Sequence, residues 1–143
     1  MAIPNPYQQY RRQQIITSSQ EKLLIMLYDG AIRFCRQAKK DLEDRQYEIS
    51  HHSLIKAQNI LIELISSLNT EFEIAQNLSS LYDYLYRRLV EANMKKDCAI
   101  IDEVIEFLTE LRKTWAEAAL KVKSEGMVGF EGKYLEFSPA ETN

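Results

Sequence analysis

The stretch Thr17-Ser-Ser-Gln-Glu-Lys-Leu-Leu-Ile-Met-Leu-Tyr-Asp-Gly-Ala-Ile-Arg-Phe34 decides the fold class. It opens with two overlapping capping boxes, in which Thr17 pairs with Gln20 and Ser18 pairs with Glu21. Apolar residues then recur in steps of three and four, at positions 24, 27, 31, 34, 38 and 42, which places them on one face of a helix. The pattern predicts a long amphipathic helix that ends near positions 43–45.

The same periodicity predicts three further helices, at about 48–68, 71–94 and 98–123. Asp97 is a favourable N-cap for the last of them. Between Thr17 and Glu125 the chain holds one glycine, Gly30, and no proline, so little interrupts helical structure there. Because the links are short, we expect an all-α, antiparallel up-down four-helix bundle. An extended coiled coil is the alternative, but the regular turn signals and the lack of long heptad continuity oppose it.

We expect the 143 residues to form a single domain. Residues 1–16 would form a short N-terminal helical arm, residues 17–124 the bundle, and residues 125–143 a flexible C-terminal tail. Gly126 is the expected stop of the last helix. Within the tail, residues 133–137 alternate in a strand-like way.

Composition excludes several classes of function. The net charge of −3 favours neither nucleic acid nor an anionic membrane. No apolar run approaches the roughly 18 residues of a membrane span, and no apolar signal segment opens the chain, so we expect a cytoplasmic protein without membrane insertion. Cys35 and Cys98 are far apart and lack CxxC spacing, as is typical of small buried thiols in a reducing compartment.

The sequence contains no motif for catalysis, metal binding or a cofactor. His51 and His52 are adjacent, so on a helix they point about 100° apart and are expected to be exposed. No HExxH motif is present. The glycines at 126, 129 and 132 lack the strand, the Lys-Ser/Thr pair and the helix of a phosphate-binding loop. We therefore expect no enzyme, no metal and no cofactor.

Three of the helices carry more apolar residues than a bundle stripe requires. The additional residues are Ile25, Met26, Tyr28, Ile32, Ile55, Ile60, Ile62, Ile65, Tyr82, Tyr84 and Tyr86. A compact or dimeric bundle would bury this surface. Otherwise the surface is a groove for an amphipathic partner segment.

The N-terminal arm contains Asn5-Pro-Tyr-Gln-Gln-Tyr10. Asn5 suits a helix N-cap and Pro6 the first helical position, so a short helix over about 6–14 would place Tyr7 and Tyr10 on one face. Isolated helices below about 12–15 residues are marginal, so this helix must dock. It is either a lid that a better ligand displaces or a permanent structural cap.

Taken together, the motifs of the chain resemble the FliS family of flagellar secretion chaperones. The residues that carry the resemblance are Asn5–Tyr10, Leu23–Phe34, Leu81–Leu85, Ala92-Asn93, Lys96-Asp97, Leu111-Arg112 and Trp115. They cover essentially the whole chain in the family's order. One departure is Gln20, which stands where the family often has proline after its Thr-x-Ser cap.

The resemblance implies a non-enzymatic bundle that binds the disordered C-terminal segment of newly made flagellin in the cytosol. The chaperone would prevent premature polymerisation and keep flagellin competent for flagellar type III secretion. The flagellar export gate and regulatory proteins are further implied partners. Pro6, Tyr7 and Tyr10 carry over as lid residues.

The residues Tyr28, Asp29 and Arg33 also match the family motif. Asp29 and Arg33, four apart on one helix face, are expected to pair with each other or with the arm.

For the flagellin-binding groove we predict five residues: Ile55, Ile62, Ile65, Tyr82 and Leu85. The alternative function is a self-associating structural bundle whose extra apolar face is a homodimer interface.

Overall fold

The computed structural model describes residues 16–68 and 73–125. It contains α2 (Ile16–Glu43), α3 (Tyr47–Ser66), α4 (Glu73–Lys95) and α5 (Cys98–Glu125). The predicted N-terminal arm up to residue 15, the turn at 69–70 and the tail from Gly126 lie outside the described residues. Helix α2 begins at Ile16, one residue before Thr17, where the sequence predicted its start.

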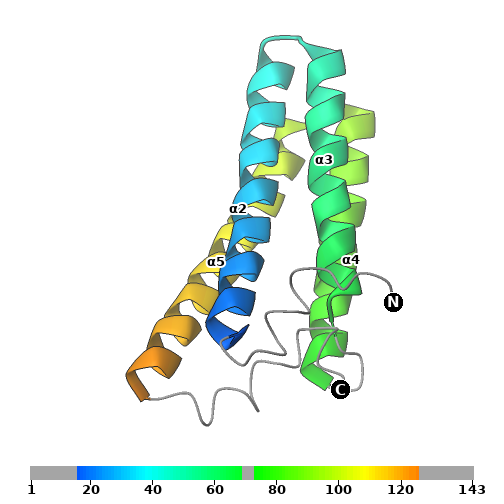
Figure 1. The fold of residues 1–143 in the computed structure, drawn as a ribbon. Helices are drawn as coiled ribbons and strands as arrows, with labels where there is room; N and C mark the ends of the chain where they lie inside the picture. Colours follow the sequence, from blue (N-terminus) through cyan, green and yellow to red (C-terminus); the bar gives the residue numbers. More distant parts are fainter. Residues whose placement is uncertain (1–15, 69–72, 126–143) are drawn as a thin grey trace, which may run out of the picture.

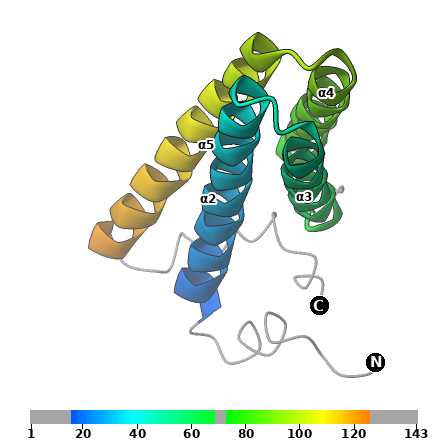
Figure 2. The same ribbon diagram turned by 90° about the horizontal axis from the view of Figure 1, so that it is seen from above.

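The four helices form a ring in which sequential neighbours run antiparallel (Figures 1 and 2). Helix α2 packs on α3 and α5, and α4 packs on the same two helices. Helices α2 and α4 are therefore diagonal partners. The predicted all-α, antiparallel four-helix bundle is confirmed.

Two tight turns at one end of the bundle connect α2 to α3 and α4 to α5 (Figure 2). Arg45 has a φ of 62° and Lys96 a φ of 54°, the left-handed conformation that commonly ends a helix. The Gln46 amide donates to the Asp41 carbonyl at 2.7 Å, and the Asp97 amide donates to the Ala92 carbonyl at 3.1 Å. Both are the long closing bonds of a Schellman motif.

Asp97 also starts the next helix, because its Oδ1 accepts a 2.9 Å bond from the Ala99 amide. The predicted N-cap of α5 is confirmed.

The core runs along the axis of the ring and is wider than the predicted stripes. On α2 the buried apolar side chains are Tyr28, Ala31, Ile32, Cys35, Ala38 and Leu42. The predicted stripe residues Leu24, Leu27 and Phe34 are only partly buried. Each helix in a ring of four faces two neighbours and the diagonal helix. These three helices together bury a wider part of its surface than a single apolar stripe. Tyr28 and Ile32 thus belong to the core, and their prediction as surplus apolar surface is wrong.

Candidate binding surfaces

An apolar strip lies outside the core where α3 meets α4. We call it the α3–α4 seam and define it by Ile55, Ile62 and Ile65 of α3 with Tyr86 and Val90 of α4. Ile62 is 47% exposed and the other four are partly buried. His51 Nδ1 and Asn93 Nδ2 lie 2.8 Å apart and set the register of the two antiparallel helices. With this register, Tyr86 lies at the level between Ile55 and Ile62.

Two of the five predicted groove residues lie in the core instead of at the surface. Tyr82 is 1% exposed and Leu85 is 0% exposed. Together with Leu89 they recur at steps of three and four on the inner face of α4. Neither side chain contributes to the outer surface of this structure, whereas Ile55, Ile62 and Ile65 do.

A buried polar cluster joins three helices. The Tyr28 and Tyr82 hydroxyls are 2.5 Å apart, and the side chain of Trp115 on α5 also hydrogen-bonds to Tyr28. An indole N–H can only donate, so Tyr28 accepts that bond. Burial raises the pKa of Tyr28 to about 12 and also raises that of Tyr82. The family-motif position Tyr28 therefore lies inside the bundle as a neutral phenol.

Asp29, the next family-motif position, pairs with α5. Its carboxylate accepts two hydrogen bonds from the guanidinium of Arg112, one of them at 3.3 Å between Nη2 and Oδ2. This hydrogen bonding raises the pKa of Arg112. The expected pair of Asp29 with Arg33 is wrong, and the alternative pairing with the N-terminal arm lies outside the described residues. Instead, the Arg33 guanidinium lies 5.2 Å from the ring centroid of Phe34.

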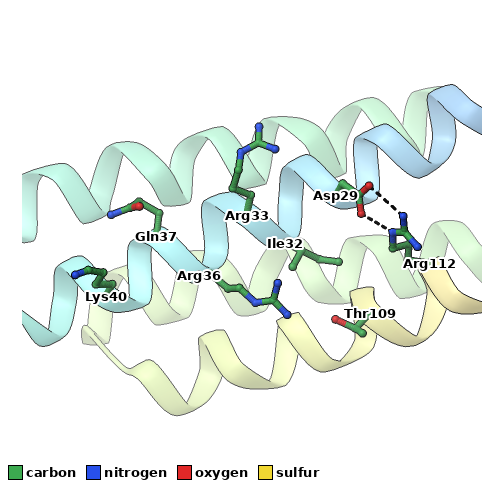
Figure 3. Close-up of a pocket in the computed structure, with 8 residues that line it drawn as sticks. All are labelled: Asp29, Ile32, Arg33, Arg36, Gln37, Lys40, Thr109 and Arg112. Carbon is green, nitrogen blue, oxygen red and sulfur yellow. Dashed lines mark hydrogen bonds and ion pairs between the residues drawn. The ribbon is translucent and has the colours of Figure 1, made fainter.

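A pocket of about 630 Å³ lies between α2 and α5 and is rich in cations (Figure 3). Its lining residues are Asp29, Ile32, Arg33, Arg36, Gln37, Lys40, Thr109 and Arg112. Arg36 points toward Thr109 of α5, while Asp29 and Arg112 close one end (Figure 3). The sequence analysis did not identify this pocket, although the spacing of the basic residues at 33, 36 and 40 places them on one helix face.

The histidines, the cysteines and the predicted lid residues are the remaining positions that the sequence analysis singled out. His51 and His52 are exposed, as predicted. Cys35 is buried, whereas Cys98 is partly buried and its Sγ lies 3.9 Å from the Lys39 carbonyl oxygen. The predicted lid residues Pro6, Tyr7 and Tyr10 lie outside the described residues.

Two absences hold for residues 16–68 and 73–125. No group of three or more His, Cys, Asp or Glu side chains there is placed to hold a metal ion. None of the four described helices combines the length and the hydropathy needed to cross a bilayer.

Comparison with known proteins gives one consistent result. The sequence model of the family described as flagellar protein FliS matches residues 3–122. A protein of Bacillus subtilis (strain 168) named flagellar secretion chaperone FliS is 41% identical over 118 residues, which are 82% of this chain and 89% of that protein. Proteins with the same name from Salmonella typhimurium and Escherichia coli (strain K12) are 36% identical over 110 residues and 34% identical over 109 residues. These alignments cover 75% and 74% of this chain, and 82% and 80% of the relatives.

Proposed function

The chain belongs to the FliS family of flagellar secretion chaperones, and we propose that its client is the C-terminal segment of newly made flagellin. The family resemblance that the motifs predicted is confirmed. Under this proposal the chaperone binds the disordered segment in the cytosol, prevents premature polymerisation and keeps flagellin competent for type III export. The export gate and regulatory proteins are further partners under the same proposal.

The observation that most supports this client is the α3–α4 seam. Ile62 is 47% exposed although it lies among the partly buried Ile55 and Ile65. An amphipathic client helix would cover this strip with its own apolar face. Fully burying an aliphatic side chain contributes roughly 1.5–3 kcal/mol.

The seam alone is too small to hold a disordered client. Ordering such a segment costs roughly 2–5 kcal/mol or more, so the contact must continue over further surface. We assign Pro6, Tyr7 and Tyr10 to a lid that the client displaces, which adds surface for that contact. Since the seam is apolar, the affinity is expected to depend only weakly on salt.

Calorimetric titration with the last forty or so residues of the same organism's flagellin tests this proposal. We expect submicromolar binding with a negative heat-capacity change, the mark of apolar burial. Ile62→Asp is expected to weaken binding about tenfold or more, because it places a charge in an apolar contact. Absence of binding at tens of micromolar would contradict the assignment of the client.

Ile49→Asp on the same helix is a matched control. Ile49 is 52% exposed, and thirteen residues at about 100° each place it on a different side of α3 from Ile62. This variant is expected to bind the flagellin segment like the parent chain. Equal losses in the two variants would show that the seam is not the contact surface.

A homodimer through the seam is the competing function, because the same exposed Ile62 would serve it. Sedimentation equilibrium over a range of concentrations separates the two. A tight dimer that Ile62→Asp dissociates would favour self-association, whereas a monomer that binds the flagellin segment supports the chaperone.

A further inference from the structure

We propose that the cation-rich pocket between α2 and α5 is a second docking surface, which binds an acidic segment of a protein other than the client. We call it the basic groove and define it by Arg33, Arg36 and Lys40 of α2 with Arg112 of α5 (Figure 3). The proposal for this groove holds whichever protein binds the α3–α4 seam.

The three cations of α2 lie on one helix face, and none of them has a strong carboxylate partner within residues 16–68 and 73–125. Within the described residues, no carboxylate lies at ion-pair distance from Arg33 or Arg36. Lys40 reaches Asp44 only at 3.9 Å, and both side chains are more than half exposed. Such a surface pair is worth little, so an incoming carboxylate competes with it easily.

The fourth cation has a structural role in the groove. Arg112 is paired with Asp29, the one carboxylate in the lining. This pair holds α5 against α2 and closes one end of the groove. Because four cations face one carboxylate, the lining keeps a positive excess within a chain whose net charge is −3.

The shape of the groove favours a polypeptide segment over a single small anion. From Arg33 to Lys40 the cations extend over seven residues, or about 10 Å along the helix axis. One phosphate or carboxylate reaches partners only at hydrogen-bond distance, roughly 3 Å, so it cannot contact all of them. A segment with successive Asp or Glu side chains can.

The floor and the overall charge restrict the partner further. Ile32 is 6% exposed and lines the base of the groove, so the base is closed by the core and the ligand contacts are left to the basic side chains. A nucleic acid carries a dense, long-range charge that the net negative chain repels. A short acidic peptide segment carries far fewer charges, so the same net charge of −3 repels it less and the local positive charge can hold it.

The basic groove and the α3–α4 seam lie on opposite edges of the helix ring, since α2 and α5 form one side and α3 and α4 the other (Figure 2). A client that extends from the seam without crossing α2 and α5 therefore leaves the groove accessible. The chaperone is built to hold two partners at once, one through apolar contacts and one through charge.

Fluorescence anisotropy with the full-length chain tests the groove. The probe is a rhodamine-labelled peptide of alternating Glu and Ser, and the control probe replaces each Glu with Gln. We expect the Glu peptide to bind at low ionic strength and the Gln peptide not to bind, with affinity falling steeply as salt is added.

The variants are chosen to separate local charge from net charge. The double variant Arg33→Glu/Arg36→Glu is expected to weaken binding of the Glu peptide about tenfold or more, whereas Arg33→Lys/Arg36→Lys retains most of it. Arg87→Glu/Lys95→Glu on α4 changes the net charge equally at side chains that are 67% and 63% exposed, and it is expected to bind nearly as the parent chain does.

Four results would overturn the proposal. The first is that the Glu peptide does not bind, and the second is that both charge-reversal variants lose the same affinity for it. The third is that inorganic phosphate at an equal concentration displaces the peptide. The fourth is that Arg33→Glu/Arg36→Glu loses as much affinity for the flagellin segment as for the Glu peptide. The last would make the groove part of the client's surface. Failure of the flagellin titration alone would affect only the proposed client.

Discussion

The hydroxyl groups of Tyr28 and Tyr82 lie 2.5 Å apart and join α2 to α4, the two helices that face each other diagonally across the bundle. Trp115 of α5 donates to the same Tyr28 oxygen. Three of the four helices thus meet at one buried polar point. Because leaving a buried polar group without a hydrogen bond costs free energy, this cluster favours one relative orientation of the three helices.

Tyr28→Phe is expected to lower the free energy of unfolding by about 1–3 kcal/mol, because it leaves the buried Tyr82 hydroxyl without its partner. Tyr82→Phe is expected to cost less, since Tyr28 keeps its bond from Trp115. Urea unfolding of the two variants measures both values. The double variant should lose less than the sum of the singles. A larger loss for Tyr82→Phe than for Tyr28→Phe would contradict the central position of Tyr28.

Stability is expected to fall as the pH rises from about 10 to about 12. Burial raises the pKa of Tyr28 from 10.0 to about 12, so the folded chain keeps a proton that the unfolded chain releases. This contribution is fully present below pH 10 and is lost as the pH passes through the folded value. Tyr82 acts in the same direction. Burial also raises the pKa of Cys35 from 9.0 to about 12, which extends the loss down to about pH 9.

Unfolding curves measured from pH 8 to 12 check this dependence. The slope of stability against pH should be shallower in Tyr28→Phe/Tyr82→Phe, and in Cys35→Ala over the lower part of the range. Parallel slopes in all three chains would show that these groups do not cause the loss.

Gly30→Ala is expected to raise the free energy of unfolding by up to about 0.5–1 kcal/mol, because alanine favours a helix interior over glycine. A Cβ at this position would lie 3.2 Å from Cδ1 of Ile60, the mobile end of a partly buried side chain. Gly30→Leu would instead force α2 and α3 apart and is expected to cost about 1–3 kcal/mol. Thermal unfolding measures both.

The variant Ile60→Val tests whether the contact with Ile60 limits this gain, because valine lacks the Cδ1 atom that lies nearest to Gly30. In that background the gain from Gly30→Ala should be larger. If Gly30→Ala destabilises both the parent chain and Ile60→Val, the packing of α2 on α3 cannot adjust to the added methyl group.

Deleting residues 1–15 is expected to leave a folded bundle, since the described core residues begin with Tyr28 and come from α2 to α5. If the arm is a lid, the truncated chain should bind the flagellin segment more tightly, because no docked helix has to be displaced. Far-UV circular dichroism and calorimetry measure the two properties. An unfolded truncated chain would identify the arm as a permanent cap.

Helix bounds were predictable because a 3.6-residue period and a few turn residues determine them locally. Asp97 illustrates this, since an N-cap depends only on the residues that follow it. The ends of α2 and α4 were also placed well, although no glycine marks them and Arg45 and Lys96 adopt the left-handed conformation instead.

The rotational setting of each helix was not predictable in the same way. Tyr28 and Tyr82 were expected at the surface, yet the diagonal packing of α2 and α4 buries both. Asp29 shows the same limit, because the local rule favoured Arg33 four residues away while the partner, Arg112, is 83 residues away. Pairings over such distances depend on how the helices pack.

The turns at Arg45 and Lys96 lie at the same end of the bundle, so the other end is where α2 and α4 begin and α3 and α5 finish (Figure 1). The helix pairs α2–α3 and α4–α5 are therefore joined at the end with these turns, whereas α3 and α4 are joined at the opposite end. Of the helix ends at that side, only the start of α2 and the end of α5 are not joined to another described helix, and helix ends of this kind open with the least free energy. We expect amide hydrogen exchange to be slowest near the turns at Arg45 and Lys96 and fastest in the first turn of α2 and the last turn of α5.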